Sequence, residues 1–134
     1  MNRPDEAKKL FECGCNCCQA VFCTFLDETN MTKEDALRLS AGFGGGFGRL
    51  REVCGAVSGM TMVLSNKFAS ADPNNKEEKA ALYALIQKAA GDFKVENGSI
   101  ICRDLLGLEE KNSSPVPEER TKKKKKKRPC SELV

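Results

Sequence analysis

The sequence contains no histidine and no tryptophan, and it has a single tyrosine. Without histidine, the chain cannot form a mixed cysteine and histidine zinc site, a haem site held by histidine, a Ser-His-Asp triad or a Cys-His dyad. Any metal site in this protein must therefore use thiolates alone, or thiolates together with oxygen ligands.

Basic side chains are scarce over most of the chain. Residues 1–110 contain 13 Lys and Arg against 16 Asp and Glu, whereas residues 111–134 contain 9 against 3. The net charge of +3 thus combines a mildly acidic body with a basic end. Because the body has no basic stripe with stacking aromatic residues, we expect no binding to nucleic acid.

Long apolar runs are also missing. No segment approaches the roughly 18 apolar residues that a membrane helix needs, and no apolar stretch follows the first basic residues. We therefore expect a cytoplasmic protein without membrane insertion. Thiols stay reduced in that compartment, so a cysteine-rich chain there is more often metal-binding, catalytic or redox-sensing than disulfide-bonded.

Helix signals recur along the chain, and strand signals are absent. Residues 75–93 have apolar side chains at the spacing of one helix face, and Asn16, Thr32 and Ser99 can cap the starts of further helices, the first of them over residues 17–28. The apolar face of the first segment consists of Leu82, Leu85, Ile86, Ala89 and Phe93. The pattern predicts an all-α, single-domain bundle of five or six helices.

The domain boundaries follow the change in composition. We predict a helical domain over residues 1–108 and a polar, basic linker over residues 109–128. The linker lysines are interpreted as a solvated charge run, with a lipid or nucleic-acid contact as the alternative. Residues 129–134 are expected to begin a truncated C-terminal helix that completes the same domain.

Cysteine is abundant, with eight residues, five of them between residues 12 and 23. Four of the eight fall at or near predicted helix starts, where unpaired N–H groups and the positive end of the helix favour a thiolate. These are Cys17, Cys54, Cys102 and Cys130. We expect them to converge on one anionic site.

The other four cysteines receive different interpretations. Cys18 and Cys23 point away from the helix face of Cys17, and we interpret them as packing residues. Cys13 and Cys15 lie in a predicted turn from which they could reach the site.

The segment "GFGGGFGR", residues 42–49, is named the glycine loop here. It lacks the lysine of a P-loop and follows no predicted strand, so nucleotide binding is not favoured. Its glycines allow a close approach of the backbone, and their N–H groups could donate to a thiolate or to a cofactor sulfur. Arg49 either adds positive charge near Cys54 or lies on the surface. The resulting cofactor-binding candidates are Gly44, Gly45, Gly46, Arg49 and Gly55.

Gly55 and Gly59 are four residues apart in the apolar segment that follows the glycine loop. They leave one helix face nearly without side chains, so another element should pack very close to it. Whether that element is a neighbouring helix or a second subunit is left open, and with it a homodimer.

Four segments of the chain resemble the C_GCAxxG_C_C family, whose members are taken to be redox-active. The matching segments are "NCCQAV", "SAGFGGGFGRLREVCGAVSGMTMVL", "ICRDLLG" and "CSELV". The resemblance implies a small helical cytosolic protein whose four family cysteines correspond to Cys17, Cys54, Cys102 and Cys130. The chain departs from the family pattern at Cys18, where a small residue is usual, in the lysine run, and in its short final segment.

Three functions agree with these observations. In the first, the four thiolates bind an iron-sulfur cluster, or alternatively zinc, in an electron-transfer protein with an unknown redox partner. In the second, Cys54 attacks a disulfide, and Cys17 or Cys102 is the resolving thiol. In the third, the cysteines only pack, and the chain is a structural or interaction domain without a cofactor.

Overall fold

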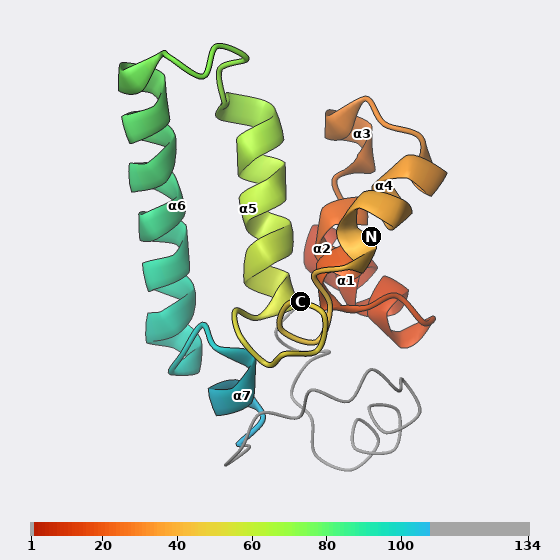
Figure 1. Ribbon diagram of the computed structural model, residues 1–134. Helices are drawn as coiled ribbons and strands as arrows, with labels where there is room; N and C mark the ends of the chain where they lie inside the picture. Colours follow the sequence, from red (N-terminus) through yellow and green to blue (C-terminus); the bar gives the residue numbers. More distant parts are fainter. Residues whose placement is uncertain (1, 108–134) are drawn as a thin grey trace.

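The computed structural model describes residues 2–107, which form seven helices and no strand (Figure 1). The helices are α1 (Arg3–Glu12), α2 (Cys17–Cys23), α3 (Leu26–Thr29), α4 (Lys33–Ala41), α5 (Gly55–Phe68), α6 (Lys76–Asn97) and α7 (Cys102–Leu105). The predicted all-α class is confirmed. The described residues form one helix more than the five or six predicted, because the helix predicted over residues 17–28 is divided into α2 and α3. The predicted linker 109–128, the segment 129–134 and Cys130 lie outside the described residues.

Side-chain caps begin two of the predicted helices. The Asn16 side chain accepts the N–H of Gln19 at 2.9 Å, and Gln19 returns the bond to the Asn16 N–H at 2.9 Å, which closes a capping box at the start of α2. The Thr32 side chain accepts the N–H of Asp35 at 3.1 Å at the start of α4. These two caps agree with the sequence prediction.

The predicted helix over residues 17–28 was too long. It is divided into α2 and α3, because the carbonyl of Thr24 accepts a hydrogen bond from Arg3 Nη1 at 2.6 Å instead of continuing the helix. Arg3 also pairs with Asp27 and Glu28, at 3.1 and 3.0 Å. A contact with α1 thus overrides the helix propensity of this segment.

Helix α5 lies between α6 on one side and the group α1 to α4 on the other (Figure 1). It packs against α2 with almost no space between the two backbones. A Cβ added to Gly55 would lie 2.8 Å from Cys17 Cβ, and one added to Gly59 would lie 2.9 Å from Val21 Cβ. The predicted close approach is confirmed, and the neighbour is the helix α2.

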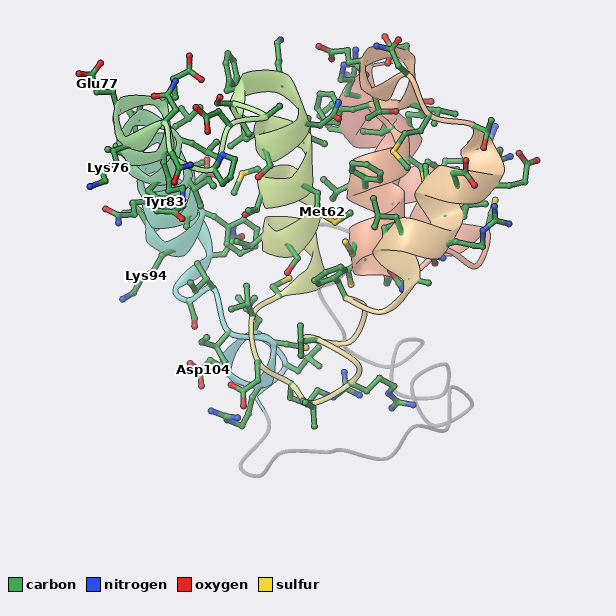
Figure 2. The ribbon with its side chains drawn as sticks, turned by 45° about the horizontal axis from the view of Figure 1, so that its top comes forward. Met62, Lys76, Glu77, Tyr83, Lys94 and Asp104 are labelled. Carbon is green, nitrogen blue, oxygen red and sulfur yellow. The ribbon has the colours of Figure 1, made fainter. Side chains whose placement is uncertain are left out.

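Helix α6 is the longest helix, but it has no fully buried residue. Its predicted apolar face, including Leu82 and Phe93, is half-buried. The opposite face is polar and exposed, and Figure 2 shows Lys76, Glu77 and Lys94 pointing away from α5. In the part of the chain that the structure describes, none of the helices combines the length and apolar character needed to cross a membrane.

Candidate functional site

Three of the four predicted site cysteines lie within the described residues, and all three are at helix starts. Cys17 is the first residue of α2, Cys54 is the N-cap of α5, and Cys102 is the first residue of α7. Each is buried, with exposed fractions of 8%, 5% and 7%. For Cys102 the predicted cap was wrong, because the N-cap is Ile101, while the predicted cap Ser99 accepts the N–H of Ile101 at 3.0 Å.

The contact between Gly55 and Cys17 brings the first two cysteines into the same region. Gly55 directly follows Cys54, and its missing side chain leaves room for Cys17 Cβ and for the backbone nitrogen of Cys18, each 2.8 Å from the place of an added Cβ. Gly55 was predicted to bind a cofactor. The structure gives it a packing contact that positions α5 against Cys17.

A short antiparallel contact brings Cys54 and Cys102 together. The N–H of Cys54 donates to Ile100 at 2.7 Å, and the N–H of Cys102 donates to Glu52 at 2.6 Å, around the bridge between Val53 and Ile101. Cys54 and Cys102 are diagonal neighbours in this register, which corresponds to about 7 to 8 Å between Cα atoms. Neither segment has a strand pattern in the sequence from which this contact could be predicted.

The glycine loop packs directly on the cysteines. Gly46 has a φ of 73°, and an added Cβ would lie 2.6 Å from Cys102 Cβ; an added Cβ at Gly44 would overlap the Asn16 side chain. Gly45 has a φ of 65°, and a Cβ added there would lie 2.6 Å from Cγ of Arg49. Gly44 and Gly46 therefore let the loop backbone approach the starts of α2 and α7.

The backbone of this region is largely hydrogen-bonded to itself. The N–H groups of residues 47–52 donate to carbonyls of residues 42–47, at 2.8 to 3.2 Å. Those six donors are therefore not directed at a thiolate or a cofactor. The role predicted for the loop amides can apply only to donors earlier in the loop.

Two arginines after the glycines are buried, Arg49 with 8% and Arg51 with 0% of its surface exposed. Arg51 Nη1 donates to Cys102 Sγ at 3.7 Å. Arg49, which was predicted to be either near the site or on the surface, is not a surface residue. Arg51 was missed, because an arginine two residues further along a charged segment carries no sequence signal of burial.

The remaining cysteines occupy different environments. Cys18 is fully buried, donates to Met62 Sδ at 3.5 Å, and has its pKa raised to about 12 by burial, with smaller contributions from Cys23 and Cys54. Burial is also the main cause that raises the pKa of Cys23 and of Cys15. These thiols are held in the protonated form, which agrees with the packing role predicted for Cys18 and Cys23.

Cys13 and Cys15 follow α1, as predicted. Cys13 is exposed at the C-cap of α1, whereas Cys15 packs against the cluster of Phe11, Cys17 and Ala20. Cys15 is thus the member of this pair that lies near Cys17.

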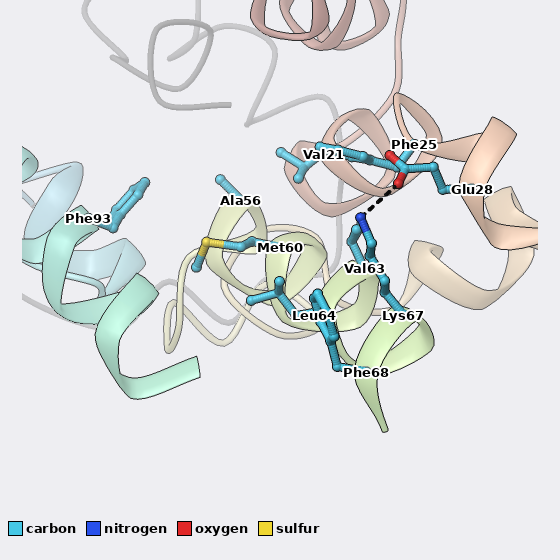
Figure 3. A pocket seen from close by; sticks show the side chains of 10 residues that line it. All are labelled: Val21, Phe25, Glu28, Ala56, Met60, Val63, Leu64, Lys67, Phe68 and Phe93. Atoms are coloured by element: carbon cyan, nitrogen blue, oxygen red, sulfur yellow. Dashed lines mark hydrogen bonds and ion pairs between the residues drawn. The ribbon is translucent and has the colours of Figure 1, made fainter. Parts of the chain in front are cut away.

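Two apolar cavities are not lined by the site cysteines, and the larger, of about 750 Å³, borders the glycine loop at Phe43 and Phe47. Figure 3 shows one of about 350 Å³ between α2, α5 and α6, lined by residues such as Val21, Met60 and Phe93 and bordered by the ion pair of Lys67 and Glu28 at 3.2 Å. None of the three site cysteines lines it. It offers no polar group that would hold a cofactor beside the thiols.

The donor types of this region suit a thiophilic metal, since three buried cysteines lie in it and the protein has no histidine. Within residues 2–107, however, no group of three or more cysteine or carboxylate side chains is arranged to hold a metal ion. A complete ligand set would need Cys130 or another donor outside these residues.

The model of one protein family matches the chain over residues 15–134, and its description is "Putative redox-active protein (C_GCAxxG_C_C)". No curated protein and no solved structure matches the sequence.

Proposed function

Because the chain belongs to the C_GCAxxG_C_C family of redox-active proteins, we propose that Cys17, Cys54, Cys102 and Cys130 form a redox site that binds an iron-sulfur cluster for electron transfer. One observation carries this proposal: three of these cysteines come from distant parts of the chain, are buried, and are linked by close contacts, which Gly55 makes with Cys17, Gly46 makes with Cys102, and residues 52–54 make with residues 100–102. Core packing alone does not explain why a thiol should stand at each of three helix starts.

The residues of the chain have separate tasks in this proposal. Gly55 and Gly46 bring the backbones of α5 and of the glycine loop against Cys17 and Cys102, which fixes the positions of these thiols. Arg51 donates to Cys102 Sγ and so favours a negative charge on that sulfur. A bound cluster would supply one-electron chemistry, and zinc is the alternative metal for the same thiolates.

The experiment is purification of the full chain without oxygen, followed by an absorption spectrum from about 300 to 600 nm and assays of iron, zinc and sulfide. We expect colour with stoichiometric iron and sulfide, and their loss in each of the variants Cys17→Ser, Cys54→Ser, Cys102→Ser and Cys130→Ser. Cys13→Ser is the matched control, because Cys13 is exposed. A colourless protein without metal in all preparations would contradict the cluster and the zinc alternative together.

Thiol-disulfide exchange is the second candidate. It is favoured by the position of Cys54 at the N-cap of the 14-residue helix α5, whose positive end favours a thiolate, next to Cys17 and Cys102. The Cys54 thiolate would attack a substrate disulfide, forming a mixed disulfide and releasing one thiol. Cys17 or Cys102 would then attack the Cys54 sulfur and release the second thiol, so that the substrate is reduced and the protein dithiol is oxidised.

Mass spectrometry separates the two candidates. For exchange, the metal-free protein treated with a disulfide substrate should lose two hydrogens, and Cys54→Ser should block both this change and substrate reduction. Unchanged turnover in Cys54→Ser would exclude Cys54 as the attacking thiol. Either reaction suits a reducing compartment, and we assign the protein to the cytoplasm on that ground.

A further inference from the structure

Arg51 is a completely buried cation with unused hydrogen-bond donors. Nη1 donates to Cys102 Sγ, while Nε and Nη2 are buried and have no hydrogen-bond partner within the described part of the chain. These two nitrogens form the side-on edge of the guanidinium, which matches two oxygens of an oxyanion or carboxylate. An arginine remains charged in a protein, so this edge presents a fixed positive charge.

A second arginine lies beside it. The N–H of Arg103 donates to the carbonyl of Arg51 at 3.2 Å, and Nη1 of Arg103 is also buried without a hydrogen-bond partner. Neither arginine takes part in the ion pairs found among residues 2–107. The nearest acidic residue along α7, Asp104, is exposed and accepts a hydrogen bond from Ser99 Oγ at 3.1 Å.

Three buried guanidinium N–H donors, on two residues whose backbones are hydrogen-bonded to each other, thus make no hydrogen bond within the described residues. A buried cationic donor of this kind favours a negatively charged partner. We propose that Arg51 and Arg103 bind a small oxyanion beside the sulfur of Cys102. Nε and Nη2 of Arg51 hold two of its oxygens, and Nη1 of Arg103 donates from the second side.

An anion would enter from the side of Arg103, because Arg51 itself is completely buried. Arg103 is only half-buried on α7, and α7 lies at the end of the described structure opposite α3, where Figure 2 shows Asp104 at the outer surface. The backbone N–H groups of residues 47–52 are occupied, so recognition rests on the two side chains. Their common chemistry fits an inorganic oxyanion or the carboxylate of a small molecule.

The test follows the arginine Nε–Hε groups by heteronuclear NMR in the full-length reduced protein. Sodium sulfate is titrated at constant ionic strength, with sodium chloride as the balancing salt and sodium acetate in a parallel titration. We expect a saturable shift of the Arg51 signal with sulfate or acetate and none with chloride. Stronger binding of sulfate identifies an inorganic oxyanion, and stronger binding of acetate identifies a carboxylate.

Substitutions test whether Arg51 and Arg103 bind the anion. Arg51→Lys, which removes the side-on edge but keeps a charge, should weaken binding at least about tenfold. Arg103→Gln should weaken it about threefold or more, and it carries the test if Arg51→Lys does not fold. Arg38→Gln is the matched control, because Arg38 is exposed on α4 and pairs with Asp35.

Equal shifts with chloride, or equal affinity in Arg103→Gln and Arg38→Gln, would overturn the proposal. The metal and disulfide experiments on the cysteines do not depend on this titration. Loss of anion binding with intact cysteine chemistry would therefore remove this inference alone.

Discussion

Helix α5 has two neighbours, and it packs against them in opposite ways. Against α2 the two backbones nearly touch at Gly55 and Gly59, and the cysteine site lies at the end of this contact. Against α6 the contact is made by half-buried side chains, and α6 contributes no fully buried residue. The clearest helix pattern in the sequence thus belongs to α6, which packs loosely against α5. The tight contact of α5 with α2, which positions the cysteines, depends on the two glycines.

The largest difference in stability is expected between two glycine-to-alanine substitutions, one in α5 at its contact with α2 and one in α6. Gly55→Ala should destabilise the fold by about 3 kcal/mol, because the new Cβ would lie 2.8 Å from Cys17 Cβ and from the Cys18 nitrogen. Gly91→Ala in α6 has open space and should stabilise it by about 0.5 to 1 kcal/mol. Urea unfolding of both variants checks this, and equal effects would refute the comparison.

The helix caps provide the next contrast. Asn16→Ala should cost about 2 kcal/mol, since it removes the capping box of α2 and the bond from Asn16 Nδ2 to the Ala41 carbonyl at 2.9 Å. Asn75→Ala should cost about 1 kcal/mol, because Asn75 makes only the cap bond to Glu78 at the start of α6. Thermal unfolding measures both, and only Asn16→Ala should also increase the reaction rate of Cys17 with alkylating reagents.

Cys18 gives the α2 to α5 contact a dependence on pH. Burial raises the pKa of the Cys18 thiol from its ordinary value of 9.0 to about 12, so above pH 9 the unfolded chain loses a proton that the folded protein keeps. The free energy of unfolding should therefore fall as the pH rises from 9 towards 12, by up to about 1.4 kcal/mol per pH unit.

The measurement is urea unfolding between pH 8 and about 11 under reducing conditions. Cys18→Ala should give a shallower decrease, while Cys13→Ser, which changes an exposed thiol, should match the original protein. The same slope in all three proteins would show that Cys18 is not the cause.

The smallest effect is expected on the outer face of α6. Lys88 pairs with Asp92 at 3.1 Å, one turn away, and both side chains are largely exposed. Lys88→Ala should change the stability by no more than about 0.5 kcal/mol, and the change should disappear at high salt. A loss of more than 1 kcal/mol would mean that the α6 side is more tightly coupled to the fold than its burial indicates.

Local signals predicted much of the fold. Asn16 and Thr32 begin helices where their side chains can cap them, and the spacing of apolar residues located α6. The end of α2 could not be predicted in the same way, because it depends on Arg3 reaching the Thr24 carbonyl from another helix. Caps and periodicity are local properties, whereas this helix end is a tertiary one.

For the candidate site, the helix starts and the family pattern selected Cys17, Cys54 and Cys102, which the structure places at helix starts. The sequence did not predict the contacts that link these cysteines. The pairing of Val53 with Ile101 is a single bridge without the alternation of a strand. Arg51 adopts a φ of 64°, unusual for a residue with a side chain, inside a charged segment that looked exposed. Both features depend on residues far apart in the sequence, so no short window could reveal them.

The bridge between Val53 and Ile101 also has a consequence for the order of folding. It joins the residues just before α5 to those just after α6, and so closes the whole helical hairpin into one loop. The entropy of closing that loop must be offset before the bridge can persist, which makes it a late contact of high sequence separation. Cys54 and Cys102 therefore approach each other only when the two ends of the hairpin do. During synthesis they remain separate thiols until α6 has been made and has packed against α5.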